Sequence, residues 1–123
     1  MAATLDPLAE LIAVVHEGGW SVGHEMPVDE PWQLPRVQVL GLPGTPTFEA
    51  WGGRTLGRAV PHDVIVWANE DHVAAAVARD VAAWVEGVHG RVIVTLDNLP
   101  HEVSDPNPQL RRWQFTATVS WRV

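Results

Sequence analysis

The chain of 123 residues contains no cysteine, no lysine and no tyrosine, and all eight of its basic residues are arginine. Without cysteine it can form neither a disulfide nor a thiolate metal site. Without lysine it lacks the side chain that holds the phosphates in a P-loop. It also contains no run of 18 apolar residues, which a membrane-spanning helix would need. The missing apolar run predicts that the chain has no membrane span, and we expect no membrane partner.

The chain is acidic, with a formal net charge of −7 at pH 7. Broad binding of nucleic-acid phosphates requires basic patches, and an acidic surface repels them. The N-terminus has no basic segment followed by an apolar stretch, so we expect no secretory signal. The length suits one domain that spans residues 1–123.

The last segment, RWQFTATVSWRV (112–123), alternates strictly between polar and apolar residues. A period of two places the two sets on opposite faces of a strand. At about 3.3 Å per residue the strand would be roughly 40 Å long, about twice the usual length. One face, with Trp113, Phe115, Ala117, Val119, Trp121 and Val123, belongs to a core. The other face carries Gln, Thr and Ser between Arg112 and Arg122.

Two segments have the pattern of amphipathic helices. The first begins at Asp6, a possible N-cap that precedes Pro7, and ends at the glycine pair 18–19. The second spans residues 69–90, where Asn69 or Asp71 can cap the start and Gly90 closes the end. Its predicted buried stripe consists of Val73, Val77, Val81, Trp84, Val85 and Val88.

Strands are predicted at 20–25, 36–42, 62–68, 91–96 and 112–123, with long loops at 26–35, 43–60 and 97–109. Residues 43–60 could form either a long excursion or an irregular hairpin. The order α-β-β-β-α-β-β predicts an α+β fold with a single mixed, mostly antiparallel β-sheet and two α-helices packed on one face. The second helix would form a right-handed crossover between parallel neighbouring strands, 62–68 and 91–96.

No catalytic or metal-binding pattern emerges. The acidic loop that follows His24 lacks the spacing and the glycine of a calcium loop. His62 and Asp63 are adjacent on a strand and therefore point to opposite faces. No serine lies in a Gly-x-Ser-x-Gly elbow. We therefore expect no cofactor, no metal and no enzymatic activity.

Six of the seven tryptophans divide into two groups. Trp67 and Trp84 lie within apolar periodicity, and Trp113 and Trp121 share the apolar face of the last strand, so we expect all four in the core. Trp32 and Trp51 lie in predicted loops, where each either tucks inward or contacts a partner.

This order of segments resembles that of the tail terminators of long-tailed bacteriophages, the minor tail protein U or tail-completion family. The resemblance is carried by HDVIVWA (62–68) leading into the Ala/Val-rich helix, RVIVTL (91–96), the loop SDPNPQ (104–109) and the final LRRWQFTATVSWRV (110–123). It spans nearly the whole chain, but at the level of pattern, since this family has no catalytic signature.

The resemblance implies a virion protein, assembled in the host cytoplasm, that forms a homo-hexameric ring at the head–tail interface. Such a ring caps the tail tube, ends its polymerisation and joins the tail to the head connector. Its partners would be other copies of the chain, the major tail tube protein and a head–tail connector or stopper. DNA would pass through the ring without sequence-specific binding, which agrees with the net negative charge.

Exposure and loop length suggest two sets of contact residues within this interpretation. Docking to the tube or connector would use Glu30, Trp32, Phe48, Trp51, Arg54 and Arg58. Contacts between subunits would use Asp105, Arg111, Arg112, Gln114, Thr116 and Thr118. Two alternatives remain: another neck component, such as a connector or stopper, and a small ligand-binding or catalytic α+β domain with a pocket lined by histidines and carboxylates.

Overall fold

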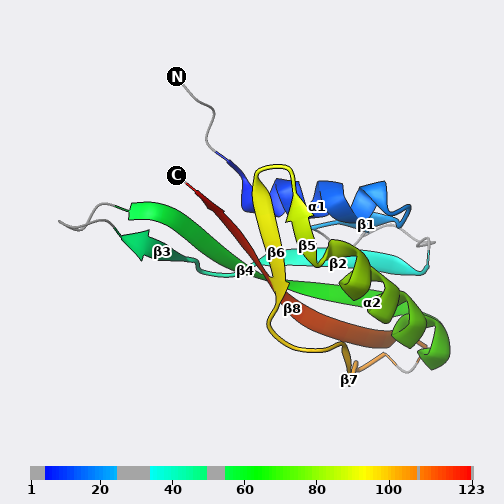
Figure 1. Cartoon of the computed structure of the whole chain (residues 1–123). Coiled ribbons are helices and arrows are strands. Elements are labelled where there is room, and N and C mark those ends of the chain that lie inside the picture. The colour runs from blue at the N-terminus through cyan, green and yellow to red at the C-terminus, as the bar shows by residue number, and fades with distance from the viewer. Residues whose placement is uncertain (1–4, 25–33, 50–54, 108, 123) are drawn as a thin grey trace.

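The computed structural model describes residues 5–24, 34–49, 55–107 and 109–122, with the backbone alone for 45–49 and 55 (Figure 1). Its helices are α1 (Pro7–Glu17) and α2 (Asp71–Val85). Its strands are β1 (Val22–Gly23), β2 (Arg36–Gly41), β3 (Thr45–Glu49), β4 (Thr55–Ala68), β5 (Gly87–His89), β6 (Val92–Leu96), β7 (His101–Val103) and β8 (Arg111–Arg122).

The described strands form one curled sheet in the order β1-β2-β4-β8-β6-β5, with β3 paired to β4 and β7 paired to β8. Among the described strands, only β1 and β2 pair in parallel, and the other pairs are antiparallel. The predicted α+β fold with a mixed, mostly antiparallel sheet is therefore confirmed.

The long C-terminal strand β8 lies in the middle of this sheet. It pairs with β4 from Arg111 to Arg122, while β7 and β6 share its other side. The alternation predicted an unusually long strand. This length fits the central position, because β8 pairs with β4 along one side and with both β6 and β7 along the other.

The predicted crossover is wrong in one respect. The strands β4 and β6 run in the same direction, since both are antiparallel to β8, but β8 lies between them. The helix α2 therefore joins two parallel strands that are not neighbours. The strand β8 comes last in the sequence but lies between β4 and β6 in the sheet. Local sequence patterns carry no information about such a long-range pairing.

Of residues 43–60, all but 50–54 are described, and the described part favours the irregular hairpin, which was one of the two alternatives. The strands β3 and β4 pair from Thr45–Ala59 to Glu49–Thr55, with register shifts on either side of Phe48. The hairpin extends beyond the helices in Figure 1. The predicted loop 97–109 also contains a short strand, β7. Of the predicted loop 26–35, only residues 34 and 35 are described.

The helix α1 begins as predicted. The Oδ1 atom of Asp6 accepts hydrogen bonds from the backbone N–H groups of Leu8 and Ala9 at 3.1 and 3.2 Å. The helix α2 begins differently, because Glu70 holds the N-cap position. The carboxylate of Asp71 accepts the indole N–H of Trp113 at 2.9 Å instead.

The end of the second helix was also predicted wrongly. The helix stops at Val85, and residues 87–89 become strand β5. Gly87 has φ +126°, a conformation that only glycine adopts readily. A two-residue loop then joins β5 to β6, with φ +58° at Gly90. Val88, predicted to lie in the buried stripe of the helix, is 73% exposed.

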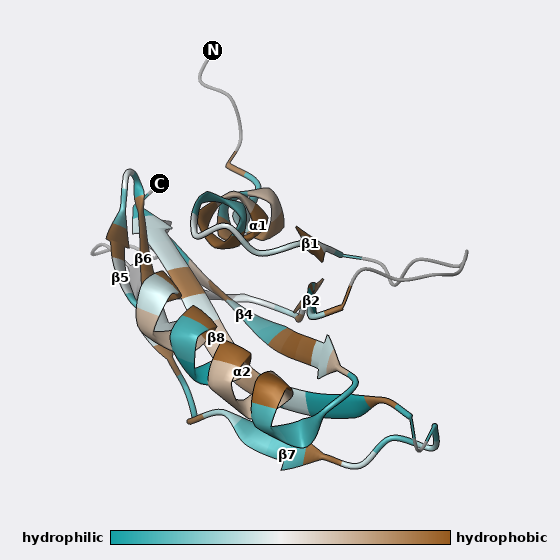
Figure 2. Cartoon of the chain, turned by 90° about the vertical axis from the view of Figure 1, so that its right-hand side faces the viewer, coloured by the Kyte–Doolittle hydropathy of each residue, from teal (hydrophilic) through white to brown (hydrophobic). Residues whose placement is uncertain are grey.

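The core lies between the two helices and one face of the sheet. Leu11, Val14 and Val15 of α1 and the alanine-rich side of α2 belong to one cluster with Val64, Val66, Phe115, Ala117 and Val119. The small side chains of Ala74, Ala78 and Ala82 let α2 approach the sheet closely, and Figure 2 shows the amphipathic pattern around this helix.

The core tryptophans only partly match the prediction. Trp67 is buried, and Trp113 and Trp121 are partly buried against the core. Trp84 is 46% exposed, which contradicts its predicted place in the buried stripe. Its indole N–H donates to the carbonyl oxygen of Val14 at 2.8 Å, so it ties α2 to α1 from the surface.

Candidate functional site

The sheet has a second face, opposite the two helices, and this face carries most of the residues predicted to contact another subunit. On β8 it contains Arg112, Gln114, Thr116, Thr118, Ser120 and Arg122, which alternate with the core residues. On β4 it contains Ala59, Pro61, Asp63, Ile65 and Trp67, which lie opposite the β8 residues in register. We call this surface the second face.

The centre of the second face is polar, and its hydroxyl groups are bonded to carboxylates of the same chain. The hydroxyl of Thr116 donates to Oδ1 of Asp63 at 3.1 Å, and the hydroxyl of Thr118 donates to Oδ2 of Asp97 at 2.7 Å. The hydroxyl groups are thus already paired within the chain. Such a surface can be buried against protein, or line a channel, without leaving an unpaired donor.

One end of the second face is organised around Trp67. Its indole N–H donates to Oε1 of Gln38 at 3.3 Å, and the guanidinium of Arg112 lies 5.4 Å from its ring centroid. The same guanidinium donates from Nε and Nη2 to Oε1 of Gln114, at 3.2 and 2.8 Å. Arg112 therefore covers an aromatic ring of its own chain, a cation–π contact for which the planar guanidinium is well suited.

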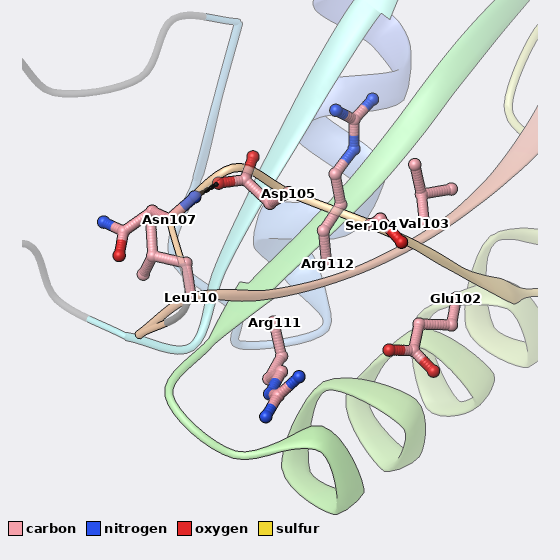
Figure 3. A pocket seen from close by; sticks show the side chains of 8 residues that line it. All are labelled: Glu102, Val103, Ser104, Asp105, Asn107, Leu110, Arg111 and Arg112. Atoms are coloured by element: carbon pink, nitrogen blue, oxygen red, sulfur yellow. Dashed lines mark hydrogen bonds between the residues drawn. The ribbon is translucent and has the colours of Figure 1, made fainter.

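Arg111 and Arg112, which were predicted with Asp105 to contact another subunit, lie on two different sides of the sheet. Figure 3 shows the two arginine side chains pointing to opposite sides of β8, as strand alternation requires. They line a small hollow of about 90 Å³ together with Glu102, Asp105 and others. Oδ1 of Asp105 accepts the backbone N–H of Asn107 at 2.9 Å, which stabilises the loop itself.

The opposite end of the second face is apolar and was missed by the sequence reasoning. Val88 on β5 is 73% exposed, and Ile93 on β6, its partner in register, is 50% exposed. With Trp121, Arg91 and Arg122 they line a hollow of about 620 Å³. The segment 91–96 has apolar residues on both faces, which was a sign that Ile93 could be exposed. The exposure of Val88 was missed because the prediction assigned this residue to the helix.

Most of the residues predicted to dock with the tube or connector lie outside the described residues. These are Glu30, Trp32, Trp51 and Arg54. Phe48 is placed on β3 by its backbone. Arg58 is exposed on β4, in the projecting hairpin and opposite Trp121 in register.

The described residues contain one buried imidazole of note, that of His62. Its Nδ1–H donates to the carbonyl oxygen of Val60 at 3.0 Å, and its Nε2 is buried without a partner among the described groups. Burial lowers the pKa of His62 below its usual 6.5, although the bond to Val60 and the charge of Asp6 act in the opposite direction. A neutral imidazole in the core is therefore favoured.

Within the described ranges, no three side chains of histidine, aspartate or glutamate gather closely enough to hold a metal ion. Neither α1 nor α2 combines the length and the apolar character that crossing a bilayer requires. The most distinctive surface is thus the second face with its apolar end.

Comparison with known proteins adds no family to this description. A scan against protein-family models finds no match, and a search of curated proteins finds none either. The function must therefore be argued from the surface that the fold presents.

Proposed function

We propose that the chain is a structural protein that assembles into a hexameric ring and terminates the tail tube of a long-tailed bacteriophage. The observation that carries the proposal is the second face, a polar sheet surface that ends in exposed Val88 on the outer strand β5 and exposed Ile93 on β6. Large apolar side chains exposed together beside a sheet edge are typical of a surface that another protein covers.

The chemistry of this face is consistent with a ring. A ring closes when each copy offers two different surfaces that complement each other. The centre of the face, with Thr116 and Thr118 bonded to acids of the same chain, offers DNA no free cation. The overall charge of −7 would also prevent a passing duplex from adhering to the ring.

The specific assignment to a tail terminator depends on the pattern resemblance of the sequence. The confirmed α+β architecture, with two helices on one side of a mostly antiparallel sheet, supports it against an all-β stopper. A connector or stopper role in the neck remains the alternative, and the same experiment separates the two.

The test has two parts. First, the mass of the purified chain is measured by light scattering at several concentrations, where a ring has six times the 13.5 kDa of one chain. Second, the chain is added to elongating tubes of the major tail protein from the same genome, and tube length is measured by electron microscopy. We expect a hexamer, or a monomer that forms rings on tube ends, and shorter tubes.

A chain that stays monomeric at every concentration and leaves tube length unchanged would refute the proposal. A ring that binds the head connector but not the tube end would favour the alternative neck role. A monomer that binds a metal or a small molecule would favour a ligand-binding domain.

A further inference from the structure

A second exposed apolar pair lies at the opposite edge of the same face of the sheet. Leu40 near the end of β2 and Leu42 directly after it are each 37% exposed. Leu40 lies opposite Asp63 in register, which places it on the second face, and the N–H of Leu42 continues the ladder by donating to the carbonyl oxygen of Pro61 at 2.9 Å. We call Leu40 and Leu42 the leucine patch, and Val88 and Ile93 the valine–isoleucine patch.

Each patch adjoins a strand edge that is open among the described residues. The strand β5 pairs with β6 on one side, and no described strand lies on the other. The strand β1 covers β2 only at Val37 and Gln38, so the outer edge of 39–41 has no described partner. Neither edge carries a lysine, glutamate, aspartate or proline, the residues that usually keep edges from pairing.

The two patches differ in the charges beside them. Arg91 and Arg122 line the hollow next to the valine–isoleucine patch, and Arg91 also reaches Glu10 at 3.4 Å. The leucine patch instead has Asp63 as its register neighbour. Like patches would bring arginines together, whereas unlike patches bring arginine towards aspartate.

From these observations we propose that the valine–isoleucine patch of one copy packs against the leucine patch of the next, with β5 and the end of β2 side by side. This inference rests on the proposed ring and identifies which surfaces close it. Because the patches lie at opposite edges of the same sheet, the contact is head-to-tail, which is the kind of contact that a cyclic ring requires. The second faces of successive copies then form one continuous surface.

The test uses two variants, Val88→Asp and Leu40→Asp, each of which places a charge in one patch. Each side chain is solvent-accessible, so the fold should be retained, as circular dichroism and thermal melting would check. We expect each variant alone to lose the hexamer and to have the mass of a single chain. The matched control is Leu99→Asp, since Leu99 is 77% exposed but belongs to neither patch; it should remain hexameric.

Mixing the two variants makes the test specific to head-to-tail contact. Val88→Asp keeps an intact leucine patch and Leu40→Asp keeps an intact valine–isoleucine patch, so together they can form one interface and no more. We expect a one-to-one heterodimer, measured by native mass spectrometry at the highest concentration at which the wild-type chain is hexameric.

Three results would overturn the inference. The hexamer could survive Val88→Asp, the mixture could contain no heterodimer, or Leu40→Asp alone could form dimers through two valine–isoleucine patches. In each of these cases a hexameric wild-type chain would leave the proposed ring standing. Failure of the ring itself is recognised separately, by a wild-type chain that is monomeric both in solution and on tubes.

Discussion

Replacing Arg112 with alanine tests whether this residue acts within its own chain. The substitution removes the guanidinium that lies 5.4 Å from the ring centroid of Trp67 and its two hydrogen bonds to Gln114. A cation–π contact at a partly covered site contributes about 0.5 to 1 kcal/mol. The hydrogen bonds add about 0.5 to 1 kcal/mol net, since water replaces part of what is lost.

We therefore expect the free energy of unfolding to fall by about 1 to 2 kcal/mol. For a chain of this size that corresponds to a decrease in Tm of roughly 4 to 8 °C. The assay is urea unfolding followed by circular dichroism, with thermal melting as a second measurement. Arg112→Lys should recover only part of the loss, because an ammonium keeps the charge but not the planar fork.

The matched control is Arg111→Ala, one residue earlier on the same strand. Arg111 is exposed and points to the other side of β8 (Figure 3), so its removal should change stability by no more than about 0.5 kcal/mol. Equal stability losses in the two alanine variants would show that the contact with Trp67 does not stabilise the fold. The assigned role of Arg112, which is to cover Trp67 of its own chain, would then be refuted.

Three further predictions concern single contacts elsewhere in the chain. Because burial lowers the pKa of His62, its contribution to stability is complete above about pH 6.5 and is lost as the pH falls through the lowered value. His62→Gln should flatten the dependence of unfolding free energy on pH below 6.5 by up to about 1.4 kcal/mol per pH unit in urea titrations, and an unchanged slope would contradict this. Gly44→Ala should lower Tm measurably, since a Cβ there would lie 2.6 Å from a methyl of Val60; an unchanged Tm would mean that β3 shifts freely. Trp84→Phe should cost about 1 kcal/mol in urea unfolding through the lost bond to Val14, whereas a neutral effect would show that the helices do not need this tie.

The sequence alone determined the elements that depend on neighbours along the chain. The Asp6–Pro7 start of α1 follows from capping, which involves residues two and three positions apart. The alternation of 112–122 determined which side chains of β8 share a face, because the side-chain period of a strand is a local property. The absence of lysine and cysteine excluded whole classes of site regardless of the fold.

The tertiary structure decided what depends on pairing between distant segments. It placed β8 between β4 and β6, separated the roles of Arg111 and Arg112, and ended α2 early so that Val88 joined an outer strand. An exposed valine on a strand and a buried valine on a helix look the same in an Ala/Val-rich sequence. What distinguishes them is the hairpin at Gly90 and the pairing of β5 with β6. The order of the strands depends on long-range burial, which no local pattern records.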